Sequence, residues 1–588
     1  MTTPIREDYP RPQHARTSWL NLNGEWEFEF DDANAGQRLG WQHGGTALTK
    51  RIQVPFAFQS KLSGIADPDF HDIVWYRKQM KLPKDFENKR VLLHFGAVDY
   101  EATVWVNGHQ VVYHEGGHTP FYADVTEALN SGGENTIVVK AVDYSRDVTL
   151  PRGKQYWLHD SASIFYTRTT GIWQTVWMEA VVSVYLNKVR FTPHLDTNQI
   201  EIEAYLKGDV TNSSIQLKVD VTFEGEAVAS DTYTVNSSQE RRVIGLQDFN
   251  DHGLGRWWSP ENPSLYDVQF TVVQDGQPID EVTSYFGMRK ISIEGGKLCL
   301  NNRPYQMKLV LDQGYFPDGN LTPPSDDAIR RDVELTKEMG FNGARKHQKI
   351  EDPRYLYWCD KLGLLVWGEA ANAYQYSNEY VRRFTKEWQE AVERDYNHPS
   401  IVVWVPINES WGVPNILIDR QQQQHALSMY YLTKSLDPTR LVVSNDGWEM
   451  VETDLYNIHD YEWREDVLTQ RYGSVEAAIS ARPANRELSV GGYAYAGQPI
   501  LVTEFGGIAY KKSEWEGWGY SGADNDEDYI AKLEAVIKPI RLSKAVQGYC
   551  YTQLTDVEQE INGLLTYDRQ PKVPLDVIRA INEGRSVN

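Results

Sequence analysis

The sequence predicts a multidomain protein of β plus α/β class: a jelly-roll β-sandwich, an immunoglobulin-like β-sandwich and a (β/α)8 TIM barrel. Short apolar runs separated by turn residues fill the first half of the chain, as is typical of antiparallel sandwiches. Near residue 290 the pattern changes to continuous apolar runs that alternate with helical stretches, which indicates a parallel sheet covered on both faces. The length of 588 residues accommodates three such domains.

The first predicted domain, the jelly roll, covers residues 1–182. Its apolar runs are short, and no long stretch repeats apolar residues with a helical period. Turn dipeptides lie between the runs, and Asn107-Gly108 favours the tight turn of a β-hairpin. The runs that we expect to form strands are 25–30, 90–95, 102–112, 135–144 and 174–180.

The second predicted domain covers residues 183–289 and continues the β pattern with shorter strands. A length of about 100 residues suits an immunoglobulin-like sandwich. Its expected strands are 188–195, 199–206, 214–223 and 266–273.

The third predicted domain, residues 290–588, is the catalytic barrel. Eight apolar runs alternate there with amphipathic segments, and eight strand–helix units in about 300 residues are typical of a TIM barrel. The segment 325–340 is a helix candidate, with Ser325 as its N-cap and Gly340 as its C-cap. The eight runs are 305–311, 341–345, 362–369, 400–409, 441–446, 455–460, 499–504 and 548–554.

The composition argues against several classes of function. A net charge of −23 opposes binding to nucleic acid or to anionic membranes, because both attract basic surfaces. No apolar run reaches the ~20 residues of a membrane span, and the first residues lack the apolar core of a secretory signal. The three cysteines, Cys299, Cys359 and Cys550, are too dispersed for a disulfide framework. We therefore expect a cytoplasmic enzyme for a neutral small molecule, with 19 Trp and 34 Tyr to stack on sugar rings or fill sandwich cores.

Three of the predicted barrel strands end in carboxylates: Glu369, Glu409 and Glu504. Reacting groups of a TIM barrel sit at the carboxyl ends of its strands, and an unpaired charge within buried apolar chain is costly. Two such residues on one rim predict a carboxylate pair, which is what glycoside hydrolysis requires. For any one glutamate, a buried salt bridge with Arg345 is the alternative.

The motifs of other chemistries are missing from the sequence. It contains no HExxH, no phosphate-binding GxxxxGK[ST], no GxGxxG after a strand and no GxSxG. His347 and His459 lie at predicted strand ends, so a metal cluster there stays an open alternative. We predict no metal and no cofactor.

Several segments match a known family. The run Asn397-His398-Pro399-Ser400-Ile401 that leads into Trp404 and Asn408-Glu409 resembles the acid/base signature of glycoside hydrolase family 2. The segment 499–506 resembles the nucleophile strand of that family, and 341–347 and 359–366 resemble its second-strand region and the stretch that follows. Near the front, 22–26, 104–108, 116–121 and 171–173 resemble its sugar-binding sandwich. The resemblance spans nearly the whole chain, and it implies the same three domains.

The resemblance also implies roles for individual residues. Glu409 would be the general acid/base and Glu504 the nucleophile, while Asn408 would bind the sugar 2-hydroxyl. Tyr461 would donate a hydrogen bond to the nucleophile, and Arg345 would support it electrostatically. Glu369 would be mainly structural. Further candidates for substrate binding are His347, His459, Asp312, Trp411 and Tyr551.

The departures from the family pattern concern the sugar. β-Glucuronidases of the family carry an Asn-x-Lys pair late in the barrel, and residues 558–564 of this chain have no lysine. We therefore predict a retaining exo-glycosidase for a neutral terminal sugar of a glycoside or oligosaccharide, with a β-galactoside as first choice. Specificity for an α-L-arabinoside, a β-mannoside or a β-glucoside stays open, as does a homo-oligomer. The alternative from another class is a non-catalytic carbohydrate-binding protein.

Overall fold

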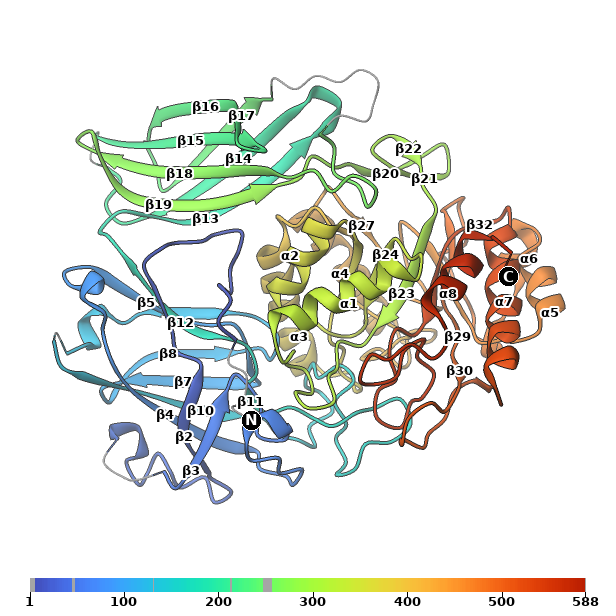
Figure 1. Cartoon of the computed structure of the whole chain (residues 1–588), viewed down its shortest axis with the longest axis horizontal. Coiled ribbons are helices and arrows are strands. Elements are labelled where there is room, and N and C mark those ends of the chain that lie inside the picture. The colour runs from blue at the N-terminus through green and yellow to red at the C-terminus, as the bar shows by residue number, and fades with distance from the viewer. Residues whose placement is uncertain (1–5, 45–47, 131, 212–213, 247–255, 587–588) are drawn as a thin grey trace.

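The computed structural model describes residues 6–44, 48–130, 132–211, 214–246 and 256–586. Two β-sandwiches lie beside a barrel of strands and helices, with the first sandwich in blue and the barrel in yellow to red (Figure 1). The predicted fold class is confirmed: two sandwich domains precede a sheet of eight parallel strands. Among the helices of the described residues, none is long and apolar enough to cross a membrane.

The first sandwich packs a six-stranded sheet against a four-stranded one. The turn between β7 and β8 contains Asn107 and Gly108, both with positive φ, as the dipeptide predicts. The strand order of the larger sheet is β3 (Lys50–Val54), β2 (Gly24–Phe30), β4 (Ile73–Lys81), β10 (Glu134–Val142), β7 (Glu101–Val106) and β8 (His109–Glu115). The order of the smaller is β1 (Trp19–Asn21), β12 (Val176–Val181), β5 (Arg90–Phe95) and β9 (Phe121–Asp124), and β6 (Val98–Asp99) pairs with β11 (Gly171–Ile172).

The second sandwich faces a three-stranded sheet with a four-stranded one, and apolar side chains of both sheets form its core. The first sheet holds β13 (Tyr185–His194), β14 (Gln199–Lys207) and β17 (Gln239–Gly245). The second holds β16 (Glu226–Thr234), β15 (Ile215–Phe223), β18 (Tyr266–Gln274) and β19 (Gln277–Phe286). A small sheet of β20 (Ile291–Glu294), β21 (Lys297–Leu300) and β22 (Arg303–Pro304) then leads into the barrel.

Each of the eight predicted runs overlaps a barrel strand. In sheet order these are β27 (Leu441–Val442), β26 (Ile401–Val405), β25 (Leu365–Glu369), β24 (Gly343–Lys346), β23 (Met307–Asp312), β32 (Val546–Thr552), β29 (Ile500–Gly506) and β28 (Tyr456–Asp460). The helices are α1 (Asp326–Glu338), α2 (Pro353–Leu362), α3 (Asn378–Asp395), α4 (Arg420–Leu436), α5 (Glu465–Arg471), α6 (Val475–Ser480), α7 (Asp526–Leu542) and α8 (Leu575–Glu583). Two short strands, β30 (Ile508–Ala509) and β31 (Ser521–Gly522), pair outside the barrel sheet.

Helix α1 begins where its capping residue predicts. The hydroxyl of Ser325 accepts a hydrogen bond from the backbone N–H of Ala328 at 3.1 Å. At the other end Met339 is the C-cap, one position before the predicted Gly340, and Gly340 follows it with φ +83°.

Side chains at successive strand positions enter two different clusters. Leu309 and Leu311 of β23 pack with Leu298 and Leu300 of the small sheet, in the cluster that fills the barrel interior. Val310, between them, packs against helix residues outside the barrel. The carboxyl ends of the strands carry polar side chains instead, and these form the site described below.

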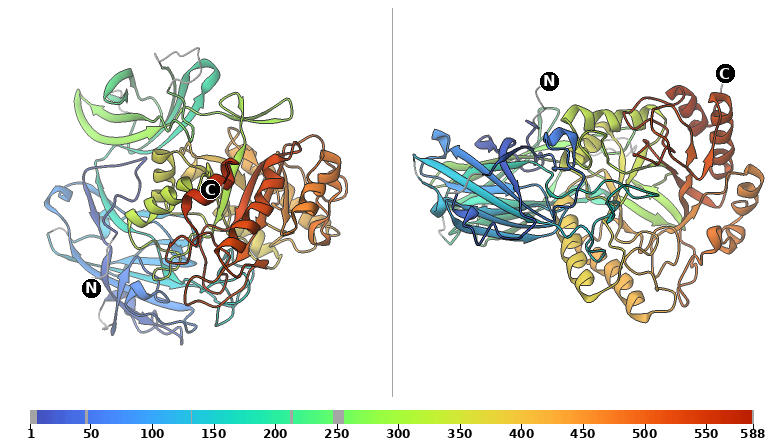
Figure 2. Two further views of the ribbon diagram at one scale, coloured as in Figure 1. Left: turned by 45° about the vertical axis from the view of Figure 1, so that its right-hand side comes forward. Right: turned by 90° about the horizontal axis from the view of Figure 1, so that it is seen from below.

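A long connection of the first sandwich, residues 143–170 between β10 and β11, crosses onto the barrel (Figures 1 and 2). The backbone N–H of Gly153 donates to the carbonyl of Asn372 at 3.0 Å, and the Tyr374 hydroxyl donates to the carbonyl of Gly153. Gly153 has φ +60°, and a Cβ there would lie 2.2 Å from the carbonyl oxygen of Gln348. The connection therefore lies directly on the carboxyl ends of the barrel strands.

Helix α3 of the barrel carries a buried carboxyl at the interface with the first sandwich. Glu387 is 3% exposed, and one of its oxygens accepts a hydrogen bond from the backbone N–H of His118 at 2.7 Å. Its other oxygen, Oε2, has no hydrogen-bond partner among the described residues. Burial raises the pKa of Glu387 to about 8, so this carboxyl holds a proton at neutral pH.

The substitution Glu387→Gln should stabilise the protein at high pH and change little at pH 5. The folded state holds the Glu387 proton more tightly than the unfolded chain, whose pKa is 4.5, so wild-type stability falls as pH rises from 4.5 through 8. The amide does not titrate. We expect the melting temperature of the variant to exceed that of the wild type by about 2–4 °C at pH 9.

Thermal melts at pH 5, 7 and 9 measure this difference. Glu393→Gln, an exposed position on the same helix, is the matched control and should show no such pH dependence. A difference between Glu387→Gln and wild type that stayed constant with pH would mean that Glu387 is ionised in the folded protein.

Candidate active site

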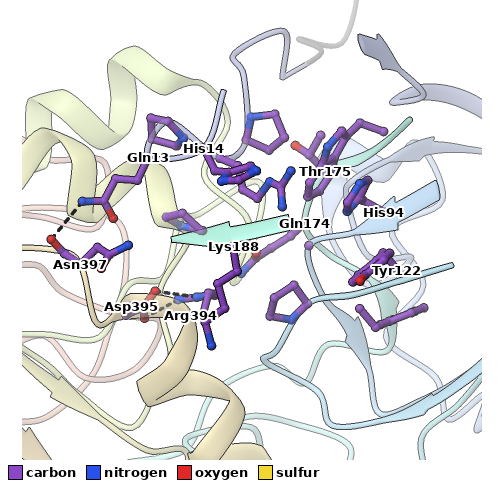
Figure 3. Close-up of a pocket in the computed structure, with 18 of the residues that line it drawn as sticks. Gln13, His14, His94, Tyr122, Gln174, Thr175, Lys188, Arg394, Asp395 and Asn397 are labelled. Carbon is purple, nitrogen blue, oxygen red and sulfur yellow. Dashed lines mark hydrogen bonds and ion pairs between the residues drawn. The ribbon is translucent and has the colours of Figure 1, made fainter. Parts of the chain in front are cut away.

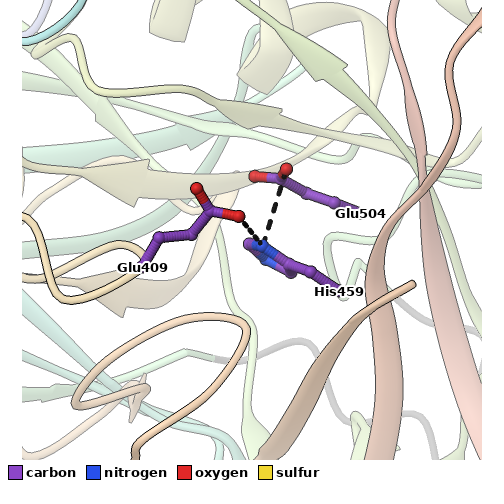
Figure 4. A group of neighbouring side chains, drawn as sticks. All are labelled: Glu409, His459 and Glu504. Carbon is purple, nitrogen blue, oxygen red and sulfur yellow. Dashed lines mark hydrogen bonds and ion pairs between the residues drawn. The ribbon is translucent and has the colours of Figure 1, made fainter. Parts of the chain in front are cut away.

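Two glutamates from different barrel strands meet at one point (Figure 4). Glu409 follows β26, and Glu504 lies on β29. The ring nitrogen Nδ1 of His459, on β28, lies 2.8 Å from Oε1 of Glu409 and 3.5 Å from Oε2 of Glu504. One ligand atom of each of the three side chains lies within 4.8 Å of the others. The pair that the strand ends predict is thus brought together in space.

The backbone after β26 turns sharply to aim Glu409 at this point. Glu409 and Ser410 have φ of +51° and +60°, a region that costs a non-glycine residue about 1–2 kcal/mol. Hydrogen bonds compensate for the strain: the N–H of Glu409 donates to the carbonyl of Asp446 at 2.9 Å, and that of Ser410 donates to the side-chain oxygen of Asn445. Asn408 is held from the other side, since its N–H donates to Asn372 at 2.8 Å.

Arg345 of β24 forms ion pairs with three buried carboxylates, and one of these is Glu504. Its side chain is fully buried, and its nitrogens lie 2.7 Å from Glu369, 2.7 Å from Asp446 and 2.9 Å from Glu504. A further N–H donates to the side-chain oxygen of Asn408. Burial raises the pKa of Glu369, and the guanidinium opposes that shift. The sequence left open whether a strand-end glutamate pairs with Arg345 or belongs to a carboxylate pair. The structure contains both the salt bridges to Arg345 and the pair of Glu409 and Glu504.

His459 carries the second positive charge of the site. Its Nε2 lies 3.3 Å from Asp446, opposite the contact of its Nδ1 with Glu409. Burial would lower the pKa of His459, but the surrounding carboxylates Glu504, Asp446 and Glu409 raise it to about 10. The same cation lowers the pKa of Glu409 against the effect of burial.

Tyr461, just beyond β28, contacts Glu504 directly. Its hydroxyl donates to Oε2 of Glu504 at 2.7 Å and lies 3.2 Å from the Thr552 hydroxyl. The ring stacks on Tyr520, with centroids 3.4 Å apart. Glu504 therefore accepts hydrogen bonds from Arg345 and from Tyr461, one on each oxygen. The two donors together fix the orientation of the carboxyl group.

The structure brings most of the predicted site residues together. Asn408, Arg345, Tyr461 and His459 surround the glutamate pair, as described. His347 lies beside them, with Nδ1 3.1 Å from Glu369 and 3.9 Å from Glu504.

Trp411 lies at the edge of the site, where its ring makes an edge contact with Tyr374 at 4.8 Å between centroids. Its indole N–H is buried and has no partner among the described residues.

Two predicted residues lie elsewhere. The carboxylate of Asp312 pairs with the ammonium of Lys346 at 2.7 Å and accepts from the N–H of Gly314. Tyr551 packs in the cluster between the barrel and its helices, edge to face with Phe505. Both side chains follow an inward-facing neighbour by one position, so they point away from the barrel interior. We therefore do not retain them as substrate contacts.

The sequence-based list lacks several residues of the site. Asp446 ends the apolar run 441–446, and it lies between Arg345 and His459. A carboxylate at a strand end was the signal that could have revealed it. Tyr520 and Trp448 come from loops with no pattern that points to the site, although they pack on Tyr461 and His459.

Glu409, His459 and Glu504 also offer one ligand atom each at a spacing that a cation could bridge. A metal needs the lone pair of a neutral imidazole, whereas the pKa of His459 is raised to about 10. The guanidinium of Arg345, 2.9 Å from Glu504, adds a further positive charge.

A separate cavity of about 350 Å³ lies between the first sandwich, residues 185–189 and the end of α3 (Figure 3). Its walls include His94, Tyr122, Lys188 and Arg394, and none of the residues around Glu504 lines it. The carboxylate site and this cavity are thus distinct.

A buried carboxylate pair on the rim of a TIM barrel, held by an arginine and a tyrosine, defines a barrel protein built for acid–base and nucleophilic chemistry. The chain belongs to the glycosyl hydrolases of family 2, which places it in the glycoside hydrolase class. The sugar binding domain of that family matches residues 20–178, its central domain matches 184–289, and its TIM barrel domain matches 291–584.

Similar proteins carry two kinds of name. The β-galactosidase of Thermoanaerobacter pseudethanolicus is 26% identical over 399 residues, which is 66% of this chain and 52% of that protein. The β-glucuronidase of Mus musculus is 25% identical over 531 residues, covering 83% of this chain and 77% of its own length. The chain thus spans about half the length of the first of these relatives.

A solved structure of the β-glucuronidase from Ruminococcus gnavus in complex with D-glucuronic acid shares the fold. Its TM-score is 0.77 at 20% identity, over 98% of this chain and 100% of that one.

The substitution Arg345→Leu should destabilise the protein by about 3–5 kcal/mol, because it leaves Glu369, Asp446 and Glu504 buried without their shared cation. Denaturant unfolding measures the loss. Arg331→Leu removes an exposed arginine that pairs with Glu338 on α1, and it should change the stability by less than about 0.5 kcal/mol. Equal effects of the two substitutions would contradict the central place of Arg345.

The substitution His459→Gln should destabilise the protein most below pH 6.5, and the effect should shrink as the pH rises. The pKa of His459 is 6.5 in the unfolded chain and about 10 in the folded state. The charged ring therefore contributes stability that is complete below pH 6.5 and disappears as pH rises through 10. Melting temperatures of wild type and variant should converge between pH 7 and pH 10.5, whereas the exposed control His109→Gln should show no such trend. A constant gap would mean that His459 is neutral.

Proposed function

We propose that the protein is a retaining exo-glycosidase that works by double displacement, with Glu504 as nucleophile and Glu409 as general acid/base. The separation of the two carboxylates carries this proposal. One oxygen of each lies within 4.8 Å of the other, close to the ~5–5.5 Å of retaining pairs and short of the ~6.5–9.5 Å of inverting pairs.

In the first step Glu504 attacks the anomeric carbon while the bond to the leaving oxygen breaks and Glu409 gives that oxygen its proton. In the second step Glu409 takes a proton from water, which attacks the same carbon and releases Glu504. Two inversions restore the original configuration. Arg345 and Tyr461 orient Glu504 through their hydrogen bonds of 2.9 and 2.7 Å.

Asn408 is suited to hold the sugar. Its side-chain nitrogen is buried and has no partner among the described residues, while Arg345 binds its oxygen. It can therefore donate to the sugar 2-hydroxyl, a contact that strengthens as positive charge develops on the ring.

His459 supplies the means to switch Glu409 between its two roles. In the free site the imidazolium donates to Glu409 and favours the carboxylate. When a bound sugar oxygen takes over this contact, the carboxylate of Glu409 loses that stabilisation. The pKa of Glu409 then rises, so the group can carry the proton that the leaving oxygen needs.

For the substrate we propose a neutral terminal sugar of a glycoside or oligosaccharide, with a β-galactoside first. The absence of lysine from residues 558–564 and the relatives named β-galactosidase support this choice. Relatives named β-glucuronidase make a uronide the main competitor, and arabinoside, mannoside and glucoside specificity complete the set. We further propose a cytoplasmic location. A panel of nitrophenyl glycosides distinguishes these sugars.

Azide rescue separates the roles of the two glutamates. In Glu409→Ala a dinitrophenyl substrate can still form the intermediate, because its leaving group needs no proton, but water lacks a general base. Azide needs no base, so it should restore turnover and give a glycosyl azide of retained configuration. In Glu504→Gly azide should enter from the vacated side and give the inverted azide.

The anomer is read by NMR. Both variants giving the same azide anomer would reverse or remove the assigned roles. Near wild-type rates for both on an unactivated substrate would mean that the catalytic centre lies elsewhere, or that the chain binds carbohydrate without hydrolysing it.

A further inference from the structure

A lysine of the first sandwich reaches the active site of the barrel. Lys154 belongs to the connection 143–170, and only 6% of its surface is exposed. The carbonyl of Lys154 accepts from the N–H of Tyr166, and the Tyr166 hydroxyl donates to Glu560, a residue of the loop after β32. The positive charge of Lys154 lowers the pKa of Glu409 and opposes the rise in the pKa of Glu560. The connection thus brings this lysine next to the loop that carries Glu560.

This ammonium lacks a protein partner. Across the described ranges, no hydrogen-bond acceptor and no ion-pair partner contacts its nitrogen, which lies over the Phe165 ring, 5.9 Å from the centroid. An ammonium without a protein partner can donate to the oxygen of a bound ligand.

The backbone holds Lys154 firmly even though its side chain is free. Its carbonyl accepts from the N–H of Tyr166 at 2.9 Å, and the preceding Gly153 is bonded to Asn372 of the barrel. The next residue, Gln155, donates to Asp99 at 2.8 Å and accepts from the N–H of Thr169 at 2.6 Å. The backbone from which the ammonium extends is thus fixed by the fold before any ligand arrives.

Glu560 faces the same space from the barrel side. It is 2% exposed, and Tyr166 of the connection donates to its Oε2 while Asn562 donates to its Oε1 at 3.1 Å. Burial raises the pKa of Glu560, and the negative charge of Glu504 adds to that rise. Each oxygen keeps a lone pair for a further donor.

We propose that Lys154 and Glu560 form a specificity pair that binds hydroxyl groups of a neutral sugar and rejects a sugar carboxylate. A hydroxyl can accept from the ammonium and donate to the carboxylate at once. A uronate cannot donate, and Glu560, Glu409 and Glu504 together repel it. The inference rests on the proposed function and deepens it, because it names the residues that select the substrate class.

Charge removal on each side of the pair tests this assignment. The variants Glu560→Gln and Lys154→Met are assayed on the neutral nitrophenyl glycoside that the wild type hydrolyses fastest and on nitrophenyl β-D-glucuronide. We expect each substitution to lower kcat/KM for the neutral substrate about 10- to 100-fold, the usual effect of losing a hydrogen bond to a charged group. The ratio of uronide to neutral activity should rise at least tenfold in Glu560→Gln and should not rise in Lys154→Met.

Glu558→Gln is the matched control. It makes the same change two residues away, where the carboxylate accepts from the backbone N–H of Thr167, and it should leave the ratio within a factor of about three. In the double variant the loss should be smaller than the product of the single losses, because both groups act on one ligand. Should Glu560→Gln fail to fold, Lys154→Met decides alone, since it must lower neutral activity at least tenfold.

Three results would overturn the pair: a wild type that prefers the uronide, an unchanged ratio in Glu560→Gln, or a Lys154→Met variant that loses only uronide activity. The last would assign Lys154 to a substrate carboxylate. The azide products of the Glu409 and Glu504 variants report separately on the proposed function. A failed rescue with an inactive wild type overturns both proposals, whereas correct anomers with an unchanged ratio overturn the specificity pair alone.

Discussion

The polar end of the barrel depends on the guanidinium of Arg345. Three carboxylates, from β25, from the segment after β27 and from β29, converge on it within 2.9 Å. Separately, each would be an uncompensated charge in a buried place. Together with one planar guanidinium they form an array whose members cannot shift independently, because each guanidinium nitrogen already donates to a protein partner. Closure of the barrel thereby fixes the direction from which Glu504 faces the space above it.

His459 extends this array toward Glu409. One ring nitrogen faces Asp446, which Arg345 also binds, and the other faces Glu409. The acid/base candidate is therefore connected to the nucleophile candidate through two cations and a shared carboxylate. Such a chain lets the arrival of a ligand at one carboxyl group alter the proton affinity of the other.

Much of this architecture can be predicted from the sequence, because continuous apolar runs and strand-end glutamates are local signals. The errors have a common physical origin. Asp312 and Tyr551 lie near strand ends, but the preceding residues Leu311 and Cys550 face the barrel interior. Because successive side chains of a strand point to opposite faces, Asp312 and Tyr551 face away from the interior. Strand β27 covers only Leu441–Val442 of the run 441–446, since Asn445 and Asp446 leave the strand to hold Glu409. Lys154 carries no local signal at all: its place follows from contacts more than 200 residues apart in sequence.

At Gly153 the backbones of the first sandwich and the barrel come so close that neither domain can be exchanged independently of the other. A side chain there would collide with the backbone at Gln348. Recombination that joined this barrel to another sandwich would have to supply a glycine at the same point, or the contact with the barrel backbone would be lost. Point mutations at other positions of the segment 143–170 do not meet this collision. New substrate preferences can therefore arise from a segment that lies outside the barrel altogether, while the catalytic strands remain unchanged.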